Sequence, residues 1–131
     1  MHIIGRLWFL IIFTFLFNFS IIMAVSESYK EFIDDQLAGI EGVYAKKMFG
    51  GVGYFVDGVI FGCIMGGVFR LKTNEQTEKK YTELGLSGYN VPGKNMTMPY
   101  FEVPESILEN PNELKKWSLE ALEISRNNKK K

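Results

Sequence analysis

Three lysines and two aromatic residues are the side chains of this sequence that could together bind a ligand. Lys47 lies near the end of one expected strand, Lys72 ends another, and Lys94 falls in a long loop. If these amines converge beside Phe49 and Tyr100, they form a small cationic site. The alternative is that they are solvated lysines at strand ends and in a loop, where charged side chains are usually found.

The residue types that carry out catalysis are scarce. The sole histidine, His2, precedes the folded part, which therefore has no histidine-based triad or metal site. Cys63 has no second cysteine to pair with, and we interpret it as a small buried strand residue, with a reactive thiol as the alternative. Asp57 suits a turn and Glu102 can face solvent, so they form no evident acid–base pair. We expect no catalytic residue, no metal, no cofactor, and hence no enzyme.

A glycine-rich run from Phe49 to Gly53 invites comparison with a phosphate-binding loop. Such a loop opens a helix, and the N-terminus of that helix holds the phosphate. Here the glycines connect two expected strands, so we interpret Gly50, Gly51 and Gly53 as turn or bulge residues. Walker and G-x-S-x-G motifs are also absent.

Charge is balanced over the chain but not within its folded part. The sequence has 15 basic and 15 acidic residues. Setting aside Arg6 and the three lysines at 129–131 leaves 11 basic residues against the same 15 acidic ones. Direct nucleic-acid binding needs a basic face, so we do not expect it.

An apolar leader precedes the domain. Residues 7–22 read LWFLIIFTFLFNFSII, which has the form of a signal peptide or membrane anchor. Met23 and the residues after it resemble the start of a cytoplasmic protein, and Ser28 with Glu31 forms a capping box soon afterwards. We expect translation to begin at Met23 and the protein to be cytoplasmic. Membrane anchoring through retained residues 7–22 is the alternative.

The elements that must position the candidate residues lie within residues 26–126, which we expect to form one domain after a leader at 1–25 and before a basic tail at 127–131. Helical spacing predicts a helix over 29–40. The pattern then predicts strands over 43–49, 52–56, 59–65 and 68–72. Tight turns are predicted at Asp57-Gly58 and at Gly66-Gly67. Together these elements predict an antiparallel meander.

The second half of the domain mixes helices with one strand. We expect a helix over 75–84, a loop over 86–95 and a strand over 96–103. Pro99 lacks a backbone donor, which places that strand at a sheet edge or gives it a bulge. A helical turn is predicted over 106–109, and Asn110-Pro111 starts a last helix that runs to about Ser125. The fold class is therefore α+β.

Three ordered segments resemble the TfoX/Sxy N-terminal domain family. The first is KKMFGGVGYFVDGVIFG at 46–62, and the second is FRLK at 69–72. The third is MPYFEVP at 98–104, followed by Asn110-Pro111 and by Trp117 in the last helix. The resemblance covers about Ser28 to Ser125, which is nearly the whole domain.

This resemblance implies a bacterial domain with a two-layer α+β sandwich related to secretion-chaperone-like folds. The namesake proteins regulate natural competence as transcription co-activators and carry a further C-terminal domain, so we expect a stand-alone member here. The family implies no catalytic residues. We therefore expect a non-enzymatic regulatory domain that acts through a protein partner, with the transcription machinery as a candidate.

Two alternatives to a protein-interaction domain remain open. The first is a small-ligand-binding domain that uses Lys47, Lys72 and Lys94. The second is a membrane-anchored accessory domain, which requires the leader to be retained. The residues of the possible interaction surface are Lys47, Phe49, Lys72, Lys94 and Tyr100.

Overall fold

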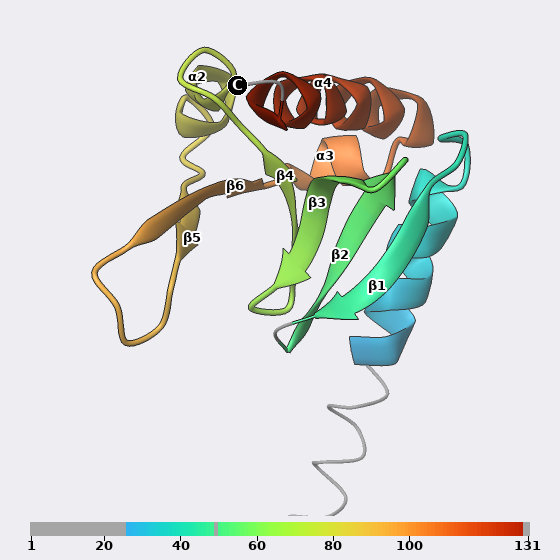
Figure 1. Cartoon of the computed structure of the whole chain (residues 1–131), viewed down its shortest axis with the longest axis horizontal. Coiled ribbons are helices and arrows are strands. Elements are labelled where there is room, and N and C mark those ends of the chain that lie inside the picture. The colour runs from blue at the N-terminus through green and yellow to red at the C-terminus, as the bar shows by residue number, and fades with distance from the viewer. Residues whose placement is uncertain (1–25, 49, 130–131) are drawn as a thin grey trace, which may run out of the picture. The chain divides into compact units, whose positions relative to one another are not determined.

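The computed structural model describes residues 26–48 and 50–129 (Figure 1). The chain divides into two units, residues 1–32 and residues 33–131. In the first unit, residues 26–32 are helical, and the leader lies outside the described residues. The second unit opens with helical residues 33–37 and contains the sheet and the core described below.

The sheet has six antiparallel strands in the order β1-β2-β3-β4-β6-β5. Its strands are β1 (Tyr44–Met48), β2 (Gly51–Val56), β3 (Val59–Met65), β4 (Val68–Lys72), β5 (Gly88–Asn90) and β6 (Thr97–Glu102). The first four form the meander predicted from the sequence, because each pairs with the next along the chain. The non-local step is the pairing of β4 with β6, which places Lys72 opposite Tyr100.

Tight turns connect the strands of the meander. Asp57 and Gly58 have φ angles of 51° and 78°, as a type I′ turn between β2 and β3 requires. Gly66 and Gly67, between β3 and β4, also have positive φ angles. Gly50 has a φ of 76° before β2. Gly51 and Gly53 instead lie within β2, so they shape the packing of the sheet and not a turn.

Three further helices follow the meander. They are α2 (Glu78–Thr82), α3 (Glu105–Leu108) and α4 (Pro111–Lys129). Helix α4 packs on β3 and β4 and buries Leu114, Ala121 and Leu122 against them. The N-terminal, middle and C-terminal helices that the sequence predicts are therefore present, and the α+β two-layer class is confirmed.

The N-cap of α4 has the geometry that its sequence predicts. The Asn110 side chain accepts a hydrogen bond from the backbone N–H of Glu113 at 3.2 Å, and Pro111 is the first residue of the helix. The helix then continues to Lys129, so residues 127–129 are helical and do not form a separate tail. The sequence prediction ended the helix too early, because residues 125–128 (SRNN) are polar and carry no apolar pattern. They also contain no Gly or Pro that would end a helix, so the length of α4 there depends on packing.

Two other helix boundaries differ from the sequence prediction. Residues 26–37 are helical, so Ser28 lies inside the helix and does not cap it. Helix α2 covers only 78–82, because the residues before it form a turn. In this turn the Asn74 Oδ1 accepts hydrogen bonds from the backbone N–H groups of Gln76 and Thr77. The polar stretch before α2 therefore forms a turn and not the first turn of the helix.

A strand within the expected loop 86–95 is the main correction to the fold. Residues 88–90 form β5 and pair with β6, so β6 lies between β4 and β5 and is not an edge strand. The sequence allowed Pro99 to lie either in an edge strand or at a bulge, and the structure has the bulge. The register of β5 and β6 shifts between Gly88 and Tyr89, which pair with the residues on either side of Pro99 and Tyr100. The carbonyl oxygen of Pro99 instead accepts the N–H of Thr73 at 2.9 Å.

Candidate functional site

On β1 and β2, one face of the sheet carries aromatic side chains that are not fully buried. Tyr54, in the centre of β2, points toward residues 33–37, because its hydroxyl donates a hydrogen bond to Asp34. Successive side chains of a strand point to opposite faces, so Gly53 and Phe55 face the other way. This second face is where an interaction surface can be built.

Tyr44 and Phe55 form a stacked pair on this face. They are register partners of β1 and β2, with ring centroids 5.4 Å apart and an interplanar angle of 13°. Tyr44 is 46% exposed and Phe55 is half-buried. Two rings are thus held rigidly at the surface by the backbone ladder between the two strands.

Gly53 is what allows the pair to lie close to the sheet. A Cβ atom at this position would lie 2.7 Å from Met48 Sδ and 2.9 Å from a ring carbon of Phe55. Both side chains therefore close over the space that a larger residue would occupy. The glycine run that resembles a phosphate loop in sequence instead supports an aromatic surface.

Two cations pack on tyrosines farther along the same face. Register places Gly53 opposite Cys63, Cys63 opposite Arg70, and Lys72 opposite Tyr100. The Arg70 guanidinium lies 4.9 Å from the Tyr89 ring centroid, and its Nε donates a hydrogen bond to the Met65 carbonyl. The Lys72 ammonium lies 5.0 Å from the Tyr100 ring centroid. Such cation–π contacts fix the long side chains in place.

We call the surface formed by Tyr44, Phe55, Arg70, Lys72, Tyr89 and Tyr100 the aromatic face. Lys46 is exposed on the same side of β1, since it pairs with Gly53. Of these residues, Tyr100 is the most deeply buried. The face therefore combines exposed rings at the β1 edge with cations toward β4.

Burial shifts the titration of three groups on this side of the sheet. It lowers the pKa of Lys72 below 10.5, because the charged amine loses solvation. Burial, together with the nearby Cys63, raises the pKa of Tyr100 to about 12. Burial also raises the pKa of the Cys63 thiol to about 12, against the opposing charge of Arg70. The thiol thus stays protonated at neutral pH and is a poor nucleophile.

The residues proposed from the sequence are only partly brought together. Lys72 and Tyr100 are in contact, whereas Lys47 lies on β1 with two strands between it and β4. Three strand spacings alone separate Lys47 from Lys72 by about 14 Å. Lys94 lies in the connection between β5 and β6, at the other side of the sheet. The three amines therefore do not converge, and Phe49 lies outside the described residues.

Several residues of the aromatic face were missed in the sequence. Phe55 could have been assigned from strand alternation, because it has the opposite parity to the buried Tyr54 and Val56. Tyr44 follows from the same reasoning once the hairpin register is known. Tyr89 and Arg70 had no such signal, since their contact depends on β5, which the sequence did not reveal.

Other kinds of site are not evident in the part of the chain that the structure describes. Between residues 26 and 129, with position 49 left aside, no three His, Cys, Asp or Glu side chains lie close enough to hold a metal ion. Over the same residues, no helix combines the length and apolar character that crossing a bilayer requires. Asp57 and Glu102 are both exposed, on the β2–β3 turn and on β6.

Comparison with known proteins identifies one family. The family model described as the TfoX N-terminal domain matches residues 35–125. A comparison with curated proteins found no match. The matched residues include all six strands and most of α4, so the similarity extends over both layers of the fold.

Proposed function

Because the chain belongs to the TfoX N-terminal domain family, we propose that it is a non-enzymatic regulatory domain that acts by binding a protein partner through its aromatic face. The transcription machinery is the candidate partner that the family resemblance favours. In this proposal the domain works in the cytoplasm, with translation starting at Met23. Neither direct nucleic-acid binding nor catalysis is part of the proposed activity.

The exposed Tyr44–Phe55 stack is the observation that carries this proposal. Tyrosine and phenylalanine are enriched in the centres of protein interfaces, because they bury a large area and lose little side-chain entropy. These two rings are already ordered by their stacking and by the β1–β2 ladder. A partner that covers them therefore gains apolar contact without ordering the side chains first.

Charge on the aromatic face as a whole indicates the kind of partner surface. Lys46, Arg70 and Lys72 lie on the aromatic face, and the acidic Glu102 lies opposite Arg70 in the register of β4 and β6. A partner with an apolar patch bordered by acidic residues is complementary to this arrangement. The charges mainly set the orientation and rate of association, and the rings supply the affinity.

Site-specific photocrosslinking in cells tests the proposal. A photoreactive phenylalanine analogue replaces Tyr44 in the full chain, and the matched control carries it in place of Leu84. Leu84 is 61% exposed and follows α2, away from the stack. We expect a discrete protein adduct from position 44 and not from position 84, identified by mass spectrometry.

Point variants then link the adduct to the rings. Phe55→Ser should abolish the adduct from position 44, whereas Leu84→Ser should leave it unchanged. Equal crosslinking from positions 44 and 84, or an adduct that survives Phe55→Ser in a folded protein, would contradict the proposal. The folded state of each variant is checked by circular dichroism, so that loss of the adduct is not mistaken for unfolding.

A further inference from the structure

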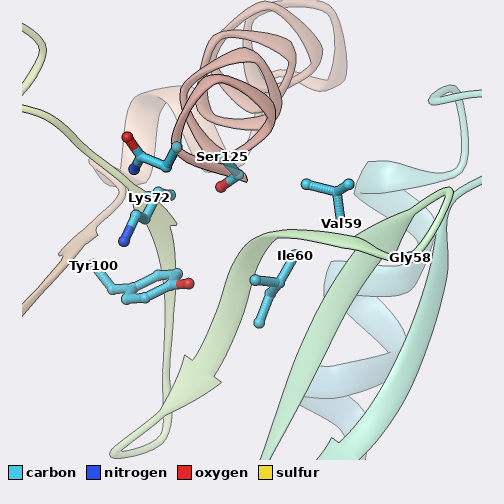
Figure 2. A pocket seen from close by; sticks show the side chains of 7 residues that line it. Gly58, Val59, Ile60, Lys72, Tyr100 and Ser125 are labelled. Atoms are coloured by element: carbon cyan, nitrogen blue, oxygen red, sulfur yellow. The ribbon is translucent and has the colours of Figure 1, made fainter. Parts of the chain in front are cut away.

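A hollow of about 310 Å³ lies where the start of β3, the end of β4, β6 and the C-terminal part of α4 meet (Figure 2). Its lining residues are Gly58, Val59, Ile60, Lys72, Tyr100, Ser125 and Asn128. Its size is at the lower end of the range for small-molecule sites. The hollow therefore suits a small ligand.

Lys72 is the charged residue of this lining, and within the described residues no carboxylate is paired with it. Figure 2 shows its amine beside the Tyr100 ring, and the distance to the ring centroid is 5.0 Å. Across residues 26–48 and 50–129, no carboxylate forms an ion pair with Lys72; Asp57, next to the lining, is paired with Arg126 at 3.7 Å. A half-buried ammonium without an anion is unfavourable, and an anionic ligand would relieve this.

Ser125 of α4 also lines the hollow. Its Oγ atom is buried and, within the described residues, has no hydrogen-bond partner. In Figure 2 the hydroxyl lies on the side of α4 that faces the hollow. Because the Oγ atom is fully buried, a ligand in the hollow does not reach it, so Ser125 contributes wall area and not a hydrogen bond. The Tyr100 hydroxyl and the Asn128 amide add further polar groups.

The remaining surface of the hollow is apolar. Val59 and Ile60 face Lys72 across the space, and the Tyr100 ring forms part of the wall (Figure 2). Residues 125 and 128 belong to the last turns of α4, whose C-terminal end carries partial negative charge. The Lys72 ammonium therefore favours an anionic group in the hollow, and the nearby helix end partly opposes it.

From this arrangement we propose that the hollow binds a small monocarboxylate with an apolar body. The carboxylate pairs with the Lys72 ammonium, and the apolar body lies against Val59, Ile60 and the Tyr100 ring. A polyanion such as a phosphorylated metabolite fits less well, because one ammonium stands against several negative charges and the helix end repels them. The ligand site shares Lys72 and Tyr100 with the aromatic face but does not include the Tyr44–Phe55 stack, on which the partner-binding proposal rests. The two proposals can therefore fail separately.

Titration of the full chain by NMR tests the site, with benzoate as the probe and neutral benzamide as its control. We expect backbone amide shifts at Gly58 and Ser125 and a shift of the Lys72 Nζ resonance. Benzoate should bind roughly tenfold more tightly than benzamide, since the charge-assisted contact is absent in the amide. Lys72→Met should remove this preference, and Lys94→Met, an exposed lysine of the β5–β6 connection, should retain it.

Four results overturn the proposal. They are the absence of benzoate-dependent shifts at millimolar concentration, equal affinity for benzoate and benzamide, equal or tighter binding of inorganic phosphate, and a preference that persists in folded Lys72→Met. If Lys72→Met does not fold, the Lys72 Nζ resonance of the unmodified protein shows whether benzoate binds at Lys72. It must move with benzoate and stay in place with benzamide.

Discussion

The hydroxyl of Tyr54 donates a hydrogen bond of 2.7 Å to Oδ1 of Asp34, and this contact joins the centre of β2 to the helical residues 33–37. Tyr54 is only 1% exposed, and its ring packs edge-on against Phe69 with centroids 5.6 Å apart. The contact fixes which face of β2 turns toward the helices. It thereby also fixes which face presents Phe55 to the outside.

Removing the Tyr54 hydroxyl should destabilise the domain. Hydrogen bonds to charged groups contribute about 1.5–3 kcal/mol, so we expect Tyr54→Phe to lower the free energy of unfolding by that amount. Urea denaturation followed by circular dichroism measures the change. Tyr44→Phe is the matched control and should change stability by less than about 0.5 kcal/mol, because Tyr44 is exposed. Equal effects of the two variants would show that the Tyr54 contact does not connect the layers as described.

Three glycine-to-alanine variants should differ in a fixed order. At Gly51 a Cβ atom would meet the backbone oxygen of Ile64, which cannot yield without moving β3. At Gly53 it would meet the ends of the Met48 and Phe55 side chains, which can rotate away. At Gly39 nothing lies within 4 Å. We expect a loss of about 3 kcal/mol or more for Gly51→Ala, about 1–2 kcal/mol for Gly53→Ala, and little or none for Gly39→Ala.

Thermal and urea denaturation of the three variants measure this order. Gly53→Ala should also reduce the Tyr44–Phe55 stacking, visible as altered aromatic-ring shifts in NMR spectra. A Gly51→Ala protein as stable as Gly39→Ala would contradict the close approach of β2 to β3.

The buried Cys63 thiol should make stability depend on alkaline pH. Its pKa is raised from 9.0 to about 12, so the folded state favours the protonated thiol. This stabilisation is fully present below pH 9 and is lost as the pH rises toward 12. At pH 10.5 the loss is about 2 kcal/mol.

Cys63→Ala removes this titration and isolates its contribution. Tyr81 and Tyr100 also have raised pKa values, and both proteins share the part that burial causes. The part of the Tyr100 shift that Cys63 causes is removed together with the thiol. We expect the unmodified protein to lose about 2 kcal/mol more than Cys63→Ala between pH 8 and pH 10.5, measured from urea midpoints. Parallel pH profiles would mean that the thiol is not buried in solution.

Asn110 should contribute to stability as the N-cap of α4. Its side chain satisfies the Glu113 N–H at 3.2 Å, and replacing such a cap with alanine costs about 1 kcal/mol. Asn112→Ala, two positions later on the exposed side of the same first turn, is the control and should be neutral or slightly stabilising. Thermal denaturation distinguishes the two, and a neutral Asn110→Ala would exclude the cap.

Local sequence signals predicted the meander well, because its turns are encoded by residues with few alternatives. Asp57-Gly58 and Gly66-Gly67 require positive φ angles that other residues rarely adopt. Strand β5 was missed because its three residues, Gly-Tyr-Asn, have no alternation and are followed by Pro92 and Gly93. It exists only through its pairing with β6.

The sequence predicts those contacts of the candidate sites that join residues close together along the chain, and not those that join distant segments. The Tyr44–Phe55 pair follows from one hairpin and from strand alternation. The contact of Lys72 with Tyr100 depends on the pairing of β4 with β6, which no local pattern in the sequence specifies. Ser125 lines the hollow because α4 packs over β3, and Asn128 lines it because α4 continues past the expected end.

The topology of the sheet also sets an order of assembly. Strands β1 to β4 pair with neighbours across turns of two residues, whereas the 24 residues 73–96 separate β4 from β6. Closing that long segment loses more chain entropy than closing a hairpin, so the meander can form early and β6 docks late. We therefore expect the hollow at Lys72 and Tyr100 to be completed late in folding and the Tyr44–Phe55 stack to form early.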